Sequence, residues 1–174
     1  MYHYNYLLQK IKSLVKEELK FTIEVYESSD ELNQDDAFLL SEARSVTQFA
    51  YAPYSNFQVG AVAKLVNGET VSGTNQENAS YPAGICAERS LLSTAASNHP
   101  GVAIETMAIT YNNLKGESNS PVSPCGICRQ VISEFQNRHK KPIKIILSGM
   151  KGKVQIIDNA GSLLPLAFTS EDLK

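Results

Sequence analysis

Hydrophobic residues recur along this chain with two different periods, and the two periods predict a mixture of helices and strands. Apolar residues spaced three or four positions apart predict three helices, and short alternating or continuous apolar runs predict strands. The helices are expected from a cap at Asn33 or Asp35 to about Pro53, from about Ile85 to His99, and from about Gly126 to Asn137. The strands are expected over residues 57–65, 69–74, 102–111, 143–148 and 154–158.

The connections between these elements predict how the strands pair. The dipeptide Asn67-Gly68 separates two strands and is a strong signal for a two-residue hairpin turn. Residues 149–153 are too few for a crossover helix, so the last two strands should be antiparallel. The sequence therefore predicts a three-layer α/β/α fold around a five-stranded mixed sheet.

The first 35 residues differ in character from the rest. Residues 6–17 carry apolar side chains at helical spacing, and residues 21–26 alternate between apolar and polar as a short strand does. We therefore expect an N-terminal extension over residues 1–35 and one domain over residues 36–174.

Composition excludes several classes of protein. The chain has 174 residues, 43% of them hydrophobic and 20% charged, with a net charge of -2 and an isoelectric point of about 5.9, so no basic footprint for nucleic acid is present. No apolar run approaches the roughly 20 residues that span a bilayer, and the N-terminus does not resemble a signal peptide. The three cysteines cannot all pair within one chain, which predicts reduced thiols and a cytoplasmic location.

The three cysteines fall in two compact groups, Cys86-Ala87-Glu88-Arg89 and residues 124–130 (PCGICRQ). Each group is expected at the first turn of a helix, where the partial positive charge of the helix end favours thiolates. Three thiolates can hold zinc and leave one position open for water, with Glu88 beside it as the acid and base. We expect the guanidinium of Arg89 to offset the excess negative charge of the thiolates.

The cysteines also permit other interpretations. Cys125 and Cys128 alone could form a redox pair, but that leaves Cys86 and Glu88 without a purpose. A closed structural zinc site would need a fourth ligand, and Glu88 is the candidate. The three histidines are isolated and are expected at the surface rather than at a metal: His3, His99 and His139.

Five ordered segments resemble one known family. They are residues 51–61 (YAPYSNFQVGA), 75–81 (NQENASY), 86–89 (CAER), 124–130 (PCGICRQ) and 163–168 (LLPLAF). Together they resemble the cytidine deaminases of the small, homotetrameric, three-cysteine zinc type, and the resemblance covers about residues 37–172. The N-terminal extension departs from the family's minimal pattern.

The resemblance implies a hydrolytic reaction. Cytidine and 2′-deoxycytidine would become uridine and 2′-deoxyuridine plus ammonia, in pyrimidine salvage, through zinc-activated hydroxide. One zinc ion per subunit would be bound by Cys86, Cys125 and Cys128, and Glu88 would shuttle protons. The alternative is a deaminase of another aminopyrimidine nucleoside or of a nucleoside antibiotic; a thiol–disulfide oxidoreductase, a nucleic-acid editing module and an inactive zinc scaffold are the rivals from other classes.

The resemblance also implies which residues bind the substrate. Phe57 would pack on the cytosine ring, Asn75 and Glu77 would bind the ribose hydroxyls, and the backbone around Ala87 would read the base edge. A carboxylate at the 3′-hydroxyl repels a 3′-phosphate, so free nucleosides rather than polynucleotides should bind.

Assembly is also implied by the family. A homotetramer with shared active sites is expected, and Tyr81 and Phe168 resemble positions that reach a neighbouring subunit's site. Neither nucleic acid nor a membrane is expected as a partner.

Overall fold

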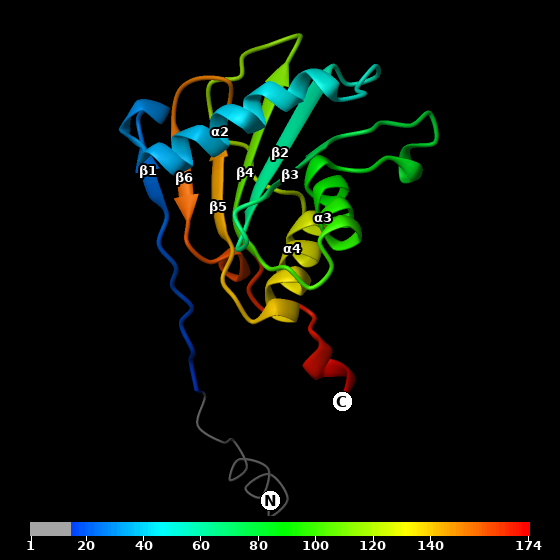
Figure 1. Cartoon of the computed structure of the whole chain (residues 1–174). Helices are drawn as coiled ribbons and strands as arrows, with labels where there is room; N and C mark the ends of the chain where they lie inside the picture. The colour runs from blue at the N-terminus through cyan, green and yellow to red at the C-terminus, as the bar shows by residue number, and fades with distance from the viewer. Residues whose placement is uncertain (1–14) are drawn as a thin grey trace, which may run out of the picture.

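A six-stranded mixed sheet lies at the centre of the computed structural model, which describes residues 15–174 (Figure 1). The strands are β1 (Glu24–Tyr26), β2 (Phe57–Leu65), β3 (Thr70–Thr74), β4 (Ile104–Asn113), β5 (Lys144–Ser148) and β6 (Val154–Ile157), and their order in the sheet is β1-β6-β5-β4-β2-β3. Only β4 and β5 are parallel, whereas every other neighbouring pair is antiparallel. The predicted antiparallel pairing of the last two strands is confirmed.

The predicted number of strands was wrong, because β1 of the N-terminal extension joins the sheet beside β6. This strand is also shorter than predicted. It pairs over three residues, Glu24 to Tyr26, because its partner strand β6 is only four residues long. The other five strands lie within two residues of their expected bounds.

Helices cover both faces of the sheet, as predicted. Helix α2 (Gln34–Val46) packs on one face, and α3 (Ala87–Asn98) and α4 (Gly126–His139) pack on the other (Figure 1). The Asn33 side chain accepts a hydrogen bond from the Asp36 backbone N–H, which confirms the predicted cap of α2. This helix ends at Val46, earlier than the predicted limit near Pro53, because a 3₁₀ turn over residues 47–49 follows it.

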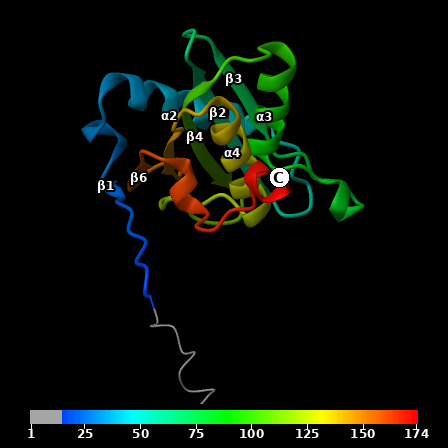
Figure 2. The ribbon, with the colours of Figure 1, turned by 90° about the horizontal axis from the view of Figure 1, so that it is seen from below.

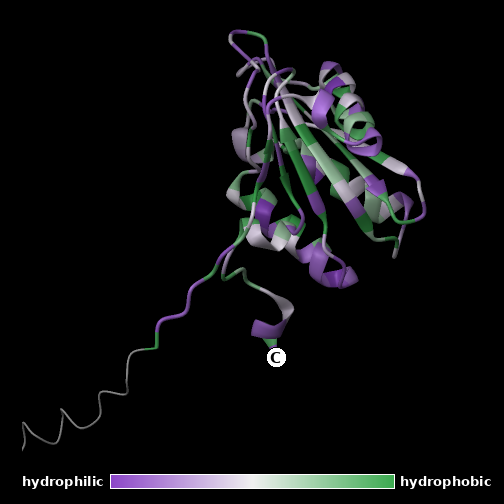
Figure 3. Cartoon of the chain, turned by 90° about the vertical axis from the view of Figure 1, so that its left-hand side faces the viewer, coloured by the Kyte–Doolittle hydropathy of each residue, from purple (hydrophilic) through white to green (hydrophobic). Residues whose placement is uncertain are grey.

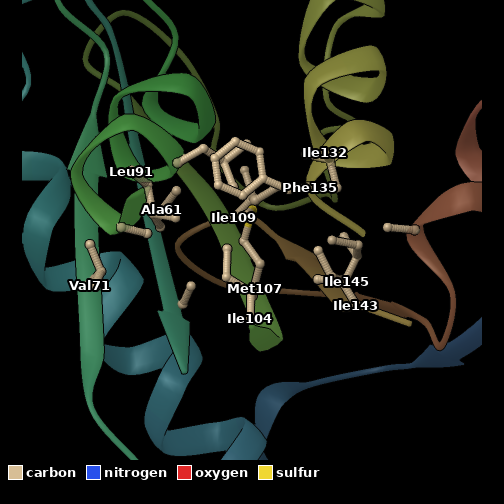
Figure 4. Close-up of a cluster of buried hydrophobic side chains, with 14 of the residues drawn as sticks. Ala61, Val71, Leu91, Ile104, Met107, Ile109, Ile132, Phe135, Ile143 and Ile145 are labelled. Carbon is tan, nitrogen blue, oxygen red and sulfur yellow. The ribbon is translucent and has the colours of Figure 1, made fainter. Parts of the chain in front are cut away.

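Two apolar clusters hold these layers together. The larger lies between the sheet and the pair α3 and α4, and includes Leu91, Met107, Ile132 and Ile145, each at most 1% exposed (Figure 4). The smaller lies under α2. Figure 3 shows the hydrophobic residues concentrated along the central strands, while the helices and connecting segments carry many hydrophilic residues.

A close approach between β3 and α3 positions one end of the site. A Cβ atom at Gly73 would lie 2.3 Å from the Leu91 backbone nitrogen and 2.5 Å from the Ala87 carbonyl oxygen. Only glycine allows this distance, so the beginning of α3 is pressed directly against the sheet.

The described part of the N-terminal extension begins with residues 15–23, which belong to no helix or strand. The segment before β1 leads away from the sheet in two views (Figures 1 and 2). The predicted helix over residues 6–17 falls mostly outside the described residues, and its last part, residues 15–17, is not helical. Between residues 15 and 174, no helix has the length and apolar character needed to cross a membrane.

Candidate active site

Three cysteine sulfurs converge where two helices begin. Cys86 and Cys125 occupy the N-cap positions of α3 and α4, and Cys128 lies in the first turn of α4. The Cys86 and Cys125 sulfurs are 3.9 Å apart, and the Cys125 and Cys128 sulfurs are 3.4 Å apart. The predicted convergence of the two cysteine groups on one point is therefore observed.

The spacing of these sulfurs fits a zinc ion. All three ligand atoms lie within 4.8 Å of one another. Tetrahedral zinc with bonds of about 2.3 Å holds its sulfurs about 3.8 Å apart, close to the observed separations. Within residues 15–174, no carboxylate or imidazole joins this group. The donor set is therefore that of an open site with three protein ligands rather than a closed structural one.

The thiols influence one another's protonation. The hydrogen bond with Cys128 lowers the pKa of Cys86 to about 6, and the nearby Arg89 guanidinium acts in the same direction. The hydrogen bond with Cys86 raises the pKa of Cys128, and burial adds to this effect. Within this pair, Cys86 is therefore the thiol that ionises more readily.

Glu88 lies beside the three sulfurs on the first turn of α3. It is only 5% exposed, and desolvation raises the pKa of its carboxyl above the ordinary value of 4.5. Hydrogen bonds from its own backbone N–H and from Cys128 act in the opposite direction. A buried carboxyl with a raised pKa holds its proton more readily than an exposed one, which suits it to proton transfer.

A cavity of about 610 Å³ opens from this point toward the surface. It brings together most of the residues that the sequence predicts for the site: Phe57, Asn75, Glu77, Tyr81, Cys86, Ala87, Glu88 and Cys125. Cys128 lies fully buried next to the inner end. Glu77 and Glu88 are the acids of the lining, and no lysine, arginine or histidine from the described residues contributes to it.

Asn75 and Glu77 fix the outer half of the cavity. The Asn75 side chain accepts a hydrogen bond from the Val59 N–H at 2.7 Å and donates one to the Phe57 carbonyl oxygen at 2.9 Å. Oε2 of Glu77 accepts hydrogen bonds from the backbone N–H groups of Tyr54 and Ser55 at 2.9 and 3.3 Å. Both side chains retain hydrogen-bonding capacity that could serve a ligand.

Phe57 forms part of the cavity wall, and a residue that sequence reasoning missed supports it. The ring of Tyr111 stacks on the Phe57 ring with 4.6 Å between centroids and 13° between planes. Tyr111 is 7% exposed and lies behind Phe57, outside the cavity lining. Ile109, two residues earlier on β4, does line the cavity, so the period of two along this strand was the available signal.

Tyr81 stands at the mouth of the cavity, and two other predicted residues lie outside the lining. Tyr81 is 73% exposed and meets the Tyr54 ring edge-on at 5.9 Å. Phe168 is 60% exposed, and its carbonyl oxygen accepts a hydrogen bond from Gln130 on α4. Arg89 is half-buried and acts on the site through its charge.

Comparison with known proteins identifies the family. The family model for the cytidine and deoxycytidylate deaminase zinc-binding region matches residues 33–141. A cytidine deaminase of Halalkalibacterium halodurans is 40% identical over 141 residues, covering 80% of this chain and 98% of that one. The crystal structure of cytidine deaminase from Burkholderia pseudomallei superposes with a TM-score of 0.67 at 37% identity, covering 79% of this chain and all of the other.

The chain therefore belongs to the cytidine and deoxycytidylate deaminase family, and it is an enzyme of that family. A more distant relative, blasticidin-S deaminase of Bacillus cereus, is 28% identical over 140 residues and covers 79% of this chain. The resemblance inferred from the five sequence segments is confirmed.

Proposed function

We propose that this enzyme hydrolyses cytidine and 2′-deoxycytidine to uridine and 2′-deoxyuridine with release of ammonia, in cytoplasmic pyrimidine salvage. One observation carries the proposal: three sulfurs and one buried carboxyl meet at the inner end of a cavity that has no basic side chain among its described residues. The odd number of cysteines in the chain supports a reducing compartment.

Zinc is the cofactor that this donor set fits, with one ion per chain bound by Cys86, Cys125 and Cys128. When bound there, zinc would act as a Lewis acid and lower the pKa of water. Arg89 would partly neutralise the negative charge of the three thiolates, which agrees with its lowering of the pKa of Cys86.

Glu88 would perform the proton transfers. Its carboxyl would protonate N3 of the cytosine ring and so make C4 more electrophilic. As the water oxygen adds at C4, the resulting carboxylate would take a proton from that water and deliver it to the departing amine. The C4–N bond would then break, ammonia would leave, and the remaining hydroxyl proton would return to Glu88 as the C4 carbonyl of uridine forms. Burial supports this role because the raised pKa lets Glu88 alternate between its acid and base forms.

The rest of the cavity would hold the nucleoside. Phe57 would pack on the base, the backbone around Ala87 would bind its polar edge, and Asn75 and Glu77 would bind the ribose hydroxyls. Ala87 is fully buried at the start of α3, so its backbone N–H and carbonyl groups are held in fixed orientations. These assignments rest on the positions of the residues along one cavity.

The charge of the lining favours a neutral nucleoside over a nucleotide. Glu77 and Glu88 make the lining acidic, and a phosphate group would find no cationic partner among the described residues. The same feature disfavours polynucleotides, whose affinity depends on lysine and arginine contacts with phosphates.

The decisive experiment measures uridine formation from cytidine by ultraviolet absorbance, ammonia release, and zinc content on one sample. We expect about one zinc per chain and turnover of cytidine and 2′-deoxycytidine, with deoxycytidylate and a cytosine-containing single-stranded oligonucleotide as poor substrates. Purified enzyme with disulfide-bonded cysteines, or zinc-loaded enzyme that leaves cytidine unchanged, would contradict the proposal.

Deamination of a nucleoside antibiotic is the second candidate, because blasticidin-S deaminase is among the relatives. A panel containing cytidine and blasticidin S separates the two candidates by kcat/KM. A higher kcat/KM for the antibiotic would favour this second function.

We also propose a homotetramer with shared active sites. Exposed apolar side chains support an interface near the C-terminus, where Leu166 is 96% and Phe168 60% exposed. Tyr81, exposed at the cavity mouth, could contact a neighbouring subunit. Light scattering on wild type and on Phe168→Ala tests this assembly, and a monomer that retains full activity would contradict it.

The proposed division of the chain is an extension over residues 1–35 and a catalytic domain over residues 36–174. The start of the family match at residue 33 supports this boundary. In the described part of the extension, β1 adds to the sheet edge beside β6, whereas the cavity is lined by residues 54–125. A variant that begins at residue 33 should therefore retain the cavity.

A further inference from the structure

We propose that Tyr111 is a positioning residue whose buried ring fixes the Phe57 ring in the cavity wall and so sets how tightly the pyrimidine ring is bound. This inference rests on the proposed function, in which Phe57 packs on the base. It concerns a residue that lies outside the cavity and would act only through its neighbour.

The backbone of Phe57 is already held at both of its polar groups. Its N–H donates to the Ser55 hydroxyl at 3.0 Å, and its carbonyl oxygen accepts from the Asn75 amide at 2.9 Å. These hydrogen bonds fix the start of β2, but they leave the two side-chain torsions of the phenylalanine free. A further contact is needed to fix the plane of the ring.

Tyr111 supplies that contact from the neighbouring strand. It pairs directly with Val59, so its ring reaches Phe57 diagonally across β2 and β4. The two rings are nearly parallel, with 13° between their planes, and their centroids are 4.6 Å apart. The two rings are therefore stacked, at a centroid distance within the range that aromatic pairs prefer.

The burial of Tyr111 makes the support rigid. The residue is 7% exposed, so its ring has little room to move, and the Phe57 ring cannot retreat from the cavity into the space that Tyr111 fills. A smaller side chain would open that space, and the Phe57 ring would gain other orientations. Each binding event would then have to order the Phe57 ring, and the entropy lost in doing so would weaken binding of the base.

The test compares three variants of the full-length, zinc-loaded enzyme. Tyr111→Leu removes the stacked ring, Tyr111→Phe retains the ring without the hydroxyl, and Phe135→Leu removes a buried ring that lies outside the cavity lining. Phe135 is 8% exposed, which matches the burial of Tyr111. The measurements are kcat and KM for cytidine, the melting temperature, and the affinity for the product uridine by calorimetry.

For Tyr111→Leu, we expect KM for cytidine and Kd for uridine to rise about tenfold while kcat stays within about threefold, because the chemistry at Glu88 is unchanged. Tyr111→Phe should keep KM and Kd within about twofold of the wild-type values. Phe135→Leu should lower the melting temperature without raising KM. An unchanged KM in Tyr111→Leu overturns the inference. An equal rise of KM and Kd in Tyr111→Phe also overturns it, as does an equal rise of KM in Phe135→Leu.

The same measurements distinguish failure of the proposed function from failure of this inference alone. Wild-type enzyme that neither converts cytidine nor binds uridine contradicts the proposed function and this inference together. Active wild-type enzyme with an unaffected Tyr111→Leu variant contradicts this inference alone.

Discussion

The inner and outer ends of the cavity are built in different ways. At the inner end, Cys86, Cys128 and Glu88 lie at the starts of two helices, and the last two are at most 5% exposed. At the outer end, Tyr54 and Tyr81 lie on connecting segments and are 46% and 73% exposed. Buried groups on rigid elements suit chemistry, whereas exposed groups on loops suit binding. Substitutions at the inner end should therefore lower kcat, and those at the outer end should raise KM.

The largest effect is expected at Glu88. Glu88→Gln retains the size of the side chain but cannot carry a proton, so kcat should fall by about four orders of magnitude. Zinc content should be unchanged because the three sulfurs remain. Glu134→Gln, an exposed acid on α4, is the matched control and should have wild-type kcat. If kcat of Glu88→Gln stays within about tenfold of wild type, Glu88 is not the proton shuttle.

The next effect is expected at Cys128, which is fully buried. Cys128→Ser replaces a sulfur ligand with a weaker oxygen donor, so zinc should be lost on dialysis and kcat/KM should fall by about 100-fold or more. The melting temperature should fall by several degrees, because metal binding contributes to folding.

Ser133→Ala changes another buried small residue of the same helix and serves as the control. It should retain zinc through the same dialysis. Retention of a full complement of zinc by Cys128→Ser would show that Cys128 is not a ligand.

The sequence predicted the inner end more completely than the outer end, for a physical reason. Cys125 and Cys128 are three residues apart at the beginning of α4, so helix geometry alone brings them to one face, and Cys86 and Glu88 lie within two residues of each other at the beginning of α3. The outer end depends on contacts between distant segments. The Asn75 side chain bonds to the Phe57 carbonyl, 18 residues away, and no local pattern reveals such a pairing.

The same limit explains what was missed elsewhere. Alternation along residues 21–26 predicted a strand, but the length of β1 is set by its partner β6, so only Glu24 to Tyr26 are paired. Tyr111 was assigned to a buried strand, but its contact with Phe57 depends on the register between β2 and β4. The hairpin at Asn67-Gly68 was predicted correctly, but its turn is longer than the predicted two residues: the Gly68 N–H donates to the Leu65 carbonyl oxygen, and Gly68 rather than Asn67 adopts a positive φ, of 87°.

At the outer end, Glu77→Gln should affect binding more than chemistry. Loss of the charged acceptor should raise KM for cytidine about tenfold and leave kcat within about threefold. The discrimination against cytidine 3′-monophosphate should shrink, because the carboxylate no longer repels the phosphate. Glu105→Gln, an exposed acid on β4, should change neither value. A fall in kcat with unchanged KM would contradict the division between the two ends.

The smallest effect concerns the dependence of stability on pH. The hydrogen bond from the Ser55 side chain lowers the pKa of Glu77 below its ordinary value of 4.5, and the backbone N–H groups of Tyr54 and Ser55 add to this. Because the pKa is lower in the folded protein, the ionised carboxylate stabilises the fold fully above pH 4.5, and this contribution is lost as the pH falls through the folded value. Wild type should therefore melt slightly above Glu77→Gln near pH 6, and the difference should vanish under more acidic conditions. Thermal melts of both proteins across this range provide the measurement, and a difference that grows on acidification would show that Glu77 does not hold this loop through its charge.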